Sequence, residues 1–295
     1  MFGQLLKLLL LAVVTIWAAV AALPDKNLHV VFCDVGQGDA VLVKMGTSQV
    51  LVDGGPDNKV LECLARNMPF YDRRIEVVIL THPQADHMNG LVDVLERYTV
   101  LRFISGPEGN GTASFRELMG LVSSSQSQVS NLYAGEEVKI DDIRFRAIWP
   151  TREYVERHVD GISKSLNGSV LGAKTDGTDL NSFGIVVRLA YGEFDVLLTG
   201  DADVEVQDDQ MRQGLVAEVE VLKVPHHGSK NGMDETWLAV VSPEAAVISV
   251  GKNNRYGHPR SEALKMLEDA GARIMRTDVE GEIEVVSDGK RWWVE

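Results

Sequence analysis

The sequence contains few cysteines and few basic side chains, and each shortage excludes a class of protein. Two cysteines, Cys33 and Cys63, cannot build a four-thiolate metal site. They could pair in an oxidising compartment, but the pattern favours two small buried hydrophobic residues. The chain has 29 Lys and Arg against 43 Asp and Glu, and this net charge of -14 argues against a surface that holds nucleic acid by bulk electrostatics.

The N-terminus has the pattern of a targeting segment. No charged residue stands between Leu8 and Ala22, Lys7 precedes this run, and Ala19-Val20-Ala21 has the small-residue spacing of a cleavage site. We therefore expect residues 1–26 to be a signal peptide or an N-terminal membrane anchor, because residues 5–23 approach the length that spans a bilayer. Both alternatives predict an exported domain, either secreted or held at the membrane.

The order of the remaining hydrophobic patterns predicts an α/β protein. Three β-branched runs open the domain as an antiparallel meander, and strand and helix patterns then alternate. With 45% hydrophobic residues and no linker, we expect one domain over residues 27–295 in which two similar halves stack their sheets. Expected strands cover 28–34, 40–44, 49–53, 76–80, 100–104, a hairpin at 137–149, 183–189, 195–198, 219–224, 245–249, 273–276 and 281–286. Expected helices cover 58–67, 90–97, 112–123 and 261–270.

We assign no catalytic or binding role to three features of the chain. Residues 151–179 are rich in Gly, Ser, Asp and Lys without a sustained period, which indicates a long excursion near a site or a mobile flap. His29 and His158 lie outside compact motifs, and we expect them to be structural or solvent-facing. The Trp292-Trp293 pair favours packing or coverage of a sheet edge over base stacking.

The stretch from Thr81 to His87 is the most informative one. The aliphatic run at 77–80 ends in two imidazoles and a carboxylate, those of His82, Asp86 and His87. Sites of α/β folds gather at the carboxyl ends of strands, so we expect these side chains in a loop after a buried strand. Asp201 follows another apolar strand, and three further histidines stand in compact loops, namely His226, His227 and His258. Each alone is more often a cap or a satisfied polar group, but together they predict a metal site.

Six motifs occur in order along the chain. They are Asp34-Val35-Gly36-Gln37-Gly38-Asp39-Ala40, Val52-Asp53-Gly54-Gly55, the His82 to His87 motif, Leu198-Thr199-Gly200-Asp201, Pro225-His226-His227-Gly228-Ser229 and Tyr256-Gly257-His258-Pro259. In this order they resemble the metallo-β-lactamase superfamily, and within it the hydrolase domain of ComEC-type competence proteins, which handle incoming DNA. The resemblance covers residues 27–295 and implies a four-layered αββα sandwich that holds one or two divalent metal ions, zinc or manganese.

The resemblance also implies a role for each matching position. His82 is implied as a ligand of a first metal ion, Asp86 and His87 as ligands of a second, and Asp201 as a bridging carboxylate. His226 is implied as the later histidine ligand, although its neighbour competes for that place. The residues with implied catalytic roles are Asp86, Asp201, His227 and His258, of which either histidine would protonate the leaving oxygen. Residues expected to orient ligands or to contact substrate are Asp34, Gln37, Asp39, Asp53, Gln84, Asn181, Ser182 and Ser229.

The chain departs from the superfamily pattern at two places. Gln84 stands where the usual motif has a second histidine, and Asn181-Ser182 stands where another branch brings a further histidine. An amide oxygen is a weaker and harder ligand than an imidazole. These departures imply a loosely held first metal ion, a preference for manganese over zinc, or a single metal ion.

The sequence therefore predicts an exported metal-dependent hydrolase, most simply a phosphodiesterase or nuclease that acts on DNA through metal-activated water. Two alternatives stay open: a hydrolase of a small ester, lactone or phosphocholine-type substrate, and a non-catalytic module of a DNA-uptake apparatus. A nuclease needs local positive charge, and the late motifs are flanked by such residues. These are Lys223, Lys230, Lys252, Arg255 and Arg260.

Overall fold

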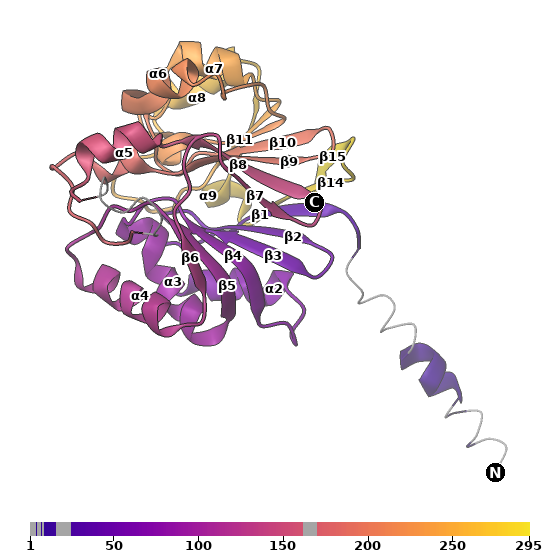
Figure 1. The fold of residues 1–295 in the computed structure, drawn as a ribbon. Helices are drawn as coiled ribbons and strands as arrows, with labels where there is room; N and C mark the ends of the chain where they lie inside the picture. Colours follow the sequence, from indigo (N-terminus) through magenta and orange to yellow (C-terminus); the bar gives the residue numbers. More distant parts are fainter. Residues whose placement is uncertain (1–3, 5–6, 8, 16–24, 162–169) are drawn as a thin grey trace.

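Two β-sheets packed face to face form the centre of the domain, and helices cover the outer face of each sheet (Figure 1). The computed structural model describes residues 4, 7, 9–15, 25–161 and 170–295. One hydrophobic cluster lies between the sheets, and two others lie between each sheet and its helices. The fold is therefore a four-layered αββα sandwich, as the sequence predicts.

The first sheet joins the start of the domain to its end. Its eight strands are β1 (Leu28–Phe32), β2 (Val41–Met45), β3 (Ser48–Val52), β4 (Arg74–Leu80), β5 (Thr99–Ser105), β6 (Gln128–Ser130), β14 (Ile283–Ser287) and β15 (Trp292–Val294), in the order β15-β14-β1-β2-β3-β4-β5-β6. Strands β1 to β3 are antiparallel, which confirms the expected meander, whereas β3 to β6 are parallel. The tryptophan pair lies in edge strand β15, as its position suggests.

The second sheet has seven strands. They are β7 (Glu137–Ile140), β8 (Ile143–Trp149), β9 (Val186–Tyr191), β10 (Phe194–Leu198), β11 (Val221–Lys223), β12 (Ala245–Ile248) and β13 (Arg273–Arg276), in the order β13-β12-β11-β10-β9-β8-β7. Strands β7 to β10 are antiparallel and β10 to β13 are parallel. Buried and exposed residues alternate along β8, as expected for a strand with one face on the core. Ile143, Phe145 and Ala147 enter the core between the sheets, and Arg144 and Arg146 are exposed.

The helices separate into two layers. Helices α2 (Lys59–Asn67), α3 (Ala85–Arg97) and α4 (Ala113–Ser124) pack on the first sheet. Helices α5 (Arg152–His158), α6 (Val204–Arg212), α7 (Glu235–Val241) and α8 (Ser261–Asp269) pack on the second sheet. Shorter helical segments are α9 (Thr277–Glu280) and the 3-10 helices η2 (Leu180–Phe183) and η3 (Pro225–Gly228).

One expectation about secondary structure is wrong. Helix α3 begins at Ala85, not at residue 90, so Asp86 and His87 lie in its first turn rather than in a loop. A carboxylate is favoured there by the helix dipole. Residues 151–179 hold one short helix, α5, which Thr151 caps by accepting a hydrogen bond from the Tyr154 backbone N–H at 3.0 Å. Residues 162–169 of the expected flap lie outside the described residues.

The two cysteines are not the separate buried residues that the sequence favours. Cys33 and Cys63 form a disulfide bond, with their Cα atoms 5.8 Å apart, and each is 1% exposed. The bond ties the segment after β1 to α2. Pairing depends on how the two Cβ atoms are placed in space, which sequence spacing alone does not fix.

The short helix at residues 9–15 lies apart from the sandwich (Figure 1). Residues 9–15 are helical and exposed, whereas the Ala19-Val20-Ala21 spacing falls outside the described residues. In the described part of the chain, no helix has the length and apolar character that crossing a bilayer requires.

Candidate metal centre

The candidate residues stand at the carboxyl ends of parallel strands. His82 follows β4, and Asp86 and His87 lie in the first turn of α3 just beyond it. Asp201 follows β10, and His226 and His227 follow β11 in η3. Because β10 and β11 are parallel neighbours, their ends bring Asp201 beside these two histidines.

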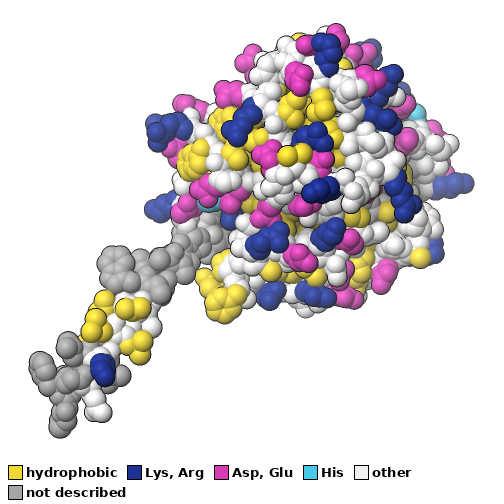
Figure 2. Space-filling model, turned by 180° about the vertical axis from the view of Figure 1, so that it is seen from behind, with side chains coloured by type: hydrophobic (Ala, Val, Ile, Leu, Met, Phe, Trp, Pro, Cys, Tyr) yellow, Lys and Arg dark blue, Asp and Glu magenta, His cyan; other side chains and the backbone are white. Residues whose placement is uncertain are grey.

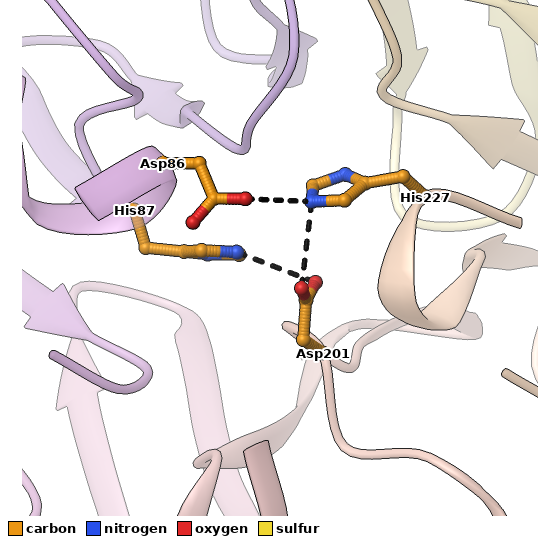
Figure 3. Close-up of side chains that lie close together, drawn as sticks. All are labelled: Asp86, His87, Asp201 and His227. Carbon is orange, nitrogen blue, oxygen red and sulfur yellow. Dashed lines mark ion pairs between the residues drawn. The ribbon is translucent and has the colours of Figure 1, made fainter. Parts of the chain in front are cut away.

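Four of these side chains converge on one small volume, and we call them the Asp-His cluster: Asp86, His87, Asp201 and His227. Each offers one ligand-type atom, and these atoms lie within 4.8 Å of one another. His87 Nε2 lies 3.3 Å from Asp201 Oδ1, and His227 Nε2 lies 3.4 Å from Asp201 Oδ2 and 3.5 Å from Asp86 Oδ2 (Figure 3). Both sheets contribute, so the cluster exists only in the folded sandwich.

Asp53 sets the orientation of two imidazoles. Its Oδ2 accepts hydrogen bonds from His87 Nδ1 and from the Thr81 hydroxyl, each at 2.8 Å, and its Oδ1 accepts from the Thr81 backbone N–H at 2.8 Å. Since the Thr81 hydroxyl proton is used on Asp53, its oxygen accepts from His82 Nδ1 at 3.1 Å. Both rings are thereby held as tautomers whose Nε2 lone pair is free, which is the arrangement of a metal-ligating histidine.

The two adjacent histidines take the reverse places to those expected. His227 Nδ1 donates to the Ser249 carbonyl oxygen at 2.8 Å, so its Nε2 faces the Asp-His cluster with a free lone pair. His226 lies outside the cluster, with Nε2 3.9 Å from Asp201 Oδ2 and Nδ1 3.9 Å from Asp203 Oδ2. Both residues have left-handed backbone angles, with φ of 49° and 53°, and this turn sends their side chains to different places.

The donor set fits a divalent cation. Nε2 of His82, His87 and His227 and Oδ1 of Asp201 are buried without a hydrogen-bond partner among the described residues. Buried polar atoms are normally paired, so nitrogen and oxygen lone pairs that face one another in this way indicate a metal ion. Burial, aided by His87, lowers the pKa of His82 to about 3, so this imidazole stays neutral and able to ligate.

Lys223 belongs to the site, although its sequence position indicates a solvated basic track. Its side chain is 1% exposed and forms an ion pair with the buried carboxylate of Asp39, so that expectation is wrong. Its Nζ also donates to the Gly200 carbonyl oxygen at 2.9 Å and lies 3.8 Å from Asp201 Oδ1. Although burial would raise it, Lys223 holds the pKa of Asp39 below its usual range. A sequence feature that predicts this burial is the position of Lys223 as a lone lysine inside the apolar Val221–Val224 run. A charge in such a run needs a buried partner.

The glycine-bearing loop contributes Asp39 but not Asp34. Asp34 is exposed, and its carboxylate accepts from the Gly36 backbone N–H at 3.2 Å. Gln37 accepts from the Gly251 N–H through Oε1 at 3.3 Å. A Cβ on Gly38 would overlap the Asp86 carbonyl, so glycine lets this loop pack against the start of α3.

The remaining expected contacts lie around the Asp-His cluster. Gln84 holds the N-cap position of α3, and its carbonyl accepts from the His87 N–H at 3.1 Å. Asn181 and Ser229 are buried, with Oδ1 and Oγ unpartnered in the described part of the chain. The Ser182 hydroxyl donates to Glu205 at 3.3 Å, which directs it toward α6.

Three other histidines have distinct surroundings. The His258 ring lies 5.8 Å from that of His226 and stacks on Tyr256, and its Nδ1 has no partner among the described residues. His29 and His158 lie away from the Asp-His cluster, where they contact Glu284 at 2.7 Å and Asp176 at 2.9 Å. Their places agree with the structural or surface positions expected for them.

Asp53→Asn is expected to weaken binding of Mn²⁺ or Zn²⁺ about 10- to 100-fold, because the amide nitrogen cannot accept the hydrogen bonds that fix His87 and Thr81. Calorimetric titration of the metal-free protein measures this change. Asp93→Asn removes an acid from the exposed surface of α3 and is the matched control. Equal affinities for both variants and the wild type would contradict this role of Asp53.

The buried carboxyl group of Glu108 is expected to make the stability of the folded protein depend on pH. It lies in the loop after β5, which the Asn110 amide joins to the Pro83 carbonyl at 2.6 Å, and burial raises the pKa of Glu108 to about 8. The unfolded chain loses this proton near its usual pKa of 4.5, so the stability of the folded state falls as pH rises from 4.5 to about 8, by up to about 1.4 kcal/mol per pH unit. Urea unfolding across this range is expected to show a shallower decline for Glu108→Gln, which cannot ionise. Parallel curves for the two proteins would refute the assignment.

Comparison with known proteins agrees with this geometry. A family model described as the β-lactamase superfamily domain matches residues 48–275, which hold all four members of the Asp-His cluster. Among curated proteins, ComE operon protein 3 of Bacillus subtilis is 27% identical over 85% of this chain and 32% of its own length. Competence protein ComA of Neisseria gonorrhoeae is 24% identical over 89% of this chain and 33% of its length. The chain spans about a third of each of these relatives.

A solved structure shows the same fold. The metallo-β-lactamase fold protein YhfI from Bacillus subtilis superposes with a TM-score of 0.51, covers 84% of this chain and 95% of its own, and is 11% identical. At that identity the likeness concerns the arrangement of the layers and not the chemistry.

Proposed function

The chain belongs to the β-lactamase superfamily, and from this premise we propose that it is a metal-dependent phosphodiesterase that cleaves DNA outside the cytoplasm. The observation that carries the proposal is the Asp-His cluster, whose unpartnered buried lone pairs suit a divalent cation. The name of the relative Competence protein ComA supports a setting in DNA uptake. Superfamily membership alone supports a hydrolase and leaves the substrate open.

The Asp-His cluster would hold the cation, with His82 beside it as a further nitrogen ligand. The His82 ring lies 4.2 Å from that of His87, and its Nε2 is free. When bound, a divalent cation supplies a Lewis acid that activates water and offsets the negative charge of a phosphodiester. The mixture of imidazole and carboxylate donors suits zinc or manganese.

The histidines outside the Asp-His cluster would handle protons and phosphate. Because Nε2 of His227 would bind the metal ion, His226 rather than His227 would donate the proton to the leaving oxygen. Although burial would lower it, Asp203 and Asp201 raise the pKa of His226, which favours a protonated ring at neutral pH. Burial, together with His227 and His226, lowers the pKa of His258 to about 4, so this neutral ring would donate a hydrogen bond to a phosphate oxygen.

Export is proposed on two grounds. The N-terminal pattern is that of a signal peptide or anchor. The disulfide between Cys33 and Cys63 suits an oxidising compartment, since such bonds are rare in proteins kept in the reducing cytosol.

The test is incubation of purified protein with single- and double-stranded DNA in the presence of Mn²⁺ or Zn²⁺. Cleavage by the wild type and its loss in Asp201→Asn and His87→Ala are expected. Equal cleavage by all three proteins would point to a contaminant and overturn the proposal. Intact DNA together with turnover of small esters or lactones would make the protein an esterase, and failure to retain either metal ion would favour a non-catalytic module.

A further inference from the structure

A hollow lies on the outer face of the second sheet, away from the core. It has a volume of about 430 Å³ and is bounded by β7, β8 and β9 on one side and by the segment after α6, at Gly214 and Leu215, on the other. Three arginines line it: Arg144 and Arg146 from β8 and Arg188 from β9. We call this hollow the arginine groove.

The register of these strands places like charges directly opposite one another. Arg146 stands opposite Arg188 of β9 on one side and opposite Glu137 of β7 on the other, and Lys139 pairs with Arg144 across β7 and β8. Facing like charges destabilise a sheet. Glu137 and Asp195 offset this cost at the Arg146–Arg188 pair, so the cost falls mainly on the Lys139–Arg144 pair, where an anionic ligand would recover it.

Two acids, Asp195 and Glu137, line the groove beside its three arginines. Arg188 pairs with Asp195 at 2.5 Å. Arg144 and Arg146 are exposed, and neither forms an ion pair or side-chain hydrogen bond in the described part of the chain, although Glu137 also lines the hollow. Their guanidinium groups are thus available, and guanidinium matches a phosphate through two parallel hydrogen bonds.

On this acidic protein, the arginine groove is a place where a polyanion can bind. The chain carries a net charge of -14, and on the face drawn in Figure 2 basic and acidic side chains are interspersed. A polyanion is repelled by such a surface as a whole and is held only where unpaired cations gather. Strand β7 is the edge of its sheet, so an extended chain can enter the groove from the side.

We propose that the arginine groove binds the backbone phosphates of a nucleic-acid strand, separately from the Asp-His cluster. The choice of nucleic acid among polyanions rests on the proposed function. Arg144 and Arg146 contact phosphates directly, whereas Arg188 is neutralised by its ion pair with Asp195. The site recognises charge and not sequence, as phosphate contacts do.

The experiment compares Arg144→Gln/Arg146→Gln with the wild type. Anisotropy of a labelled single-stranded oligonucleotide of about 20 nucleotides is measured in chelator at several salt concentrations, so that binding does not involve a metal ion. We expect affinity to fall about tenfold and the slope of log affinity against log salt to become shallower by about 1.4, or about 0.7 for each lost contact. Arg97→Gln/Lys265→Gln removes two exposed charges from α3 and α8 and is the matched control, expected to bind as the wild type does.

A second measurement separates this proposal from the function of the Asp-His cluster. Hydrolysis of bis(p-nitrophenyl) phosphate with Mn²⁺ reports on the cluster, because this small diester does not need the groove, and both double variants should retain it. Unchanged oligonucleotide affinity and salt slope in Arg144→Gln/Arg146→Gln would overturn the groove, as would a wild type that binds no oligonucleotide or a control that loses equal affinity. Groove-dependent binding without hydrolysis of any diester would uphold the groove and overturn the proposed function instead.

Discussion

His227→Ala is expected to lose at least about 100-fold in affinity for Mn²⁺ or Zn²⁺, whereas His226→Ala keeps its affinity within about threefold. The reason is geometric: His227 Nε2 faces Asp201 and Asp86 with a free lone pair, and His226 lies outside the Asp-His cluster. Loss of a direct ligand should exceed the 10- to 100-fold effect typical of a residue that only orients a ligand. The sequence favours the opposite result, so this pair of variants discriminates sharply.

Calorimetry and elemental analysis of the two alanine variants measure metal binding without reference to catalysis. In the DNA-cleavage assay, His226→Ala should bind metal yet turn over about 100-fold or more slowly, which is the usual cost of losing a general acid. A His226→Ala protein that loses its metal while His227→Ala retains it would reverse our assignment of the two side chains.

Lys223→Met is expected to destabilise the metal-free protein by about 3–5 kcal/mol, because the buried carboxylate of Asp39 loses its lysine partner and keeps only the longer contacts with His227 Nδ1 at 3.4 Å and His87 Nδ1 at 3.8 Å. This is a large share of the stability of an ordinary domain. The control is Lys230→Met, which alters another lysine of the expected basic track. Its side chain is 69% exposed, so this change should alter stability by less than about 1 kcal/mol. Urea unfolding in chelator compares the two variants in the same metal-free state.

The double variant Asp39→Asn/Lys223→Met keeps this test decisive if the single variant is too unstable to purify. Removing both charges takes away the carboxylate that lost its lysine partner, so the double variant should recover much of the lost stability. A double variant no more stable than Lys223→Met, or a Lys223→Met protein as stable as Lys230→Met, would show that the ion pair is not what Lys223 provides.

Much of the site could be predicted because its residues stand directly after strong strand patterns. The aliphatic run before His82 and that before Asp201 identify two strands by composition, and parallel pairing brings the residues at the carboxyl end of each strand to one edge of its own sheet. Prediction failed where two outcomes have the same local pattern. His226 and His227 are adjacent identical residues, and their consecutive left-handed backbone angles send their side chains to different places.

The sequence by itself determined the layers of this protein, since periods of two and of three to four residues decide which faces of strands and helices are buried. It also determined which residue types stand at the strand ends. Only the tertiary structure decided the partners: the bond between Cys33 and Cys63, the burial of Lys223 against Asp39, and the facing arginines of β8 and β9. The physical reason is that a hydrophobic period is a local property of the chain, whereas the environment of a charge or a thiol depends on segments brought beside it by folding.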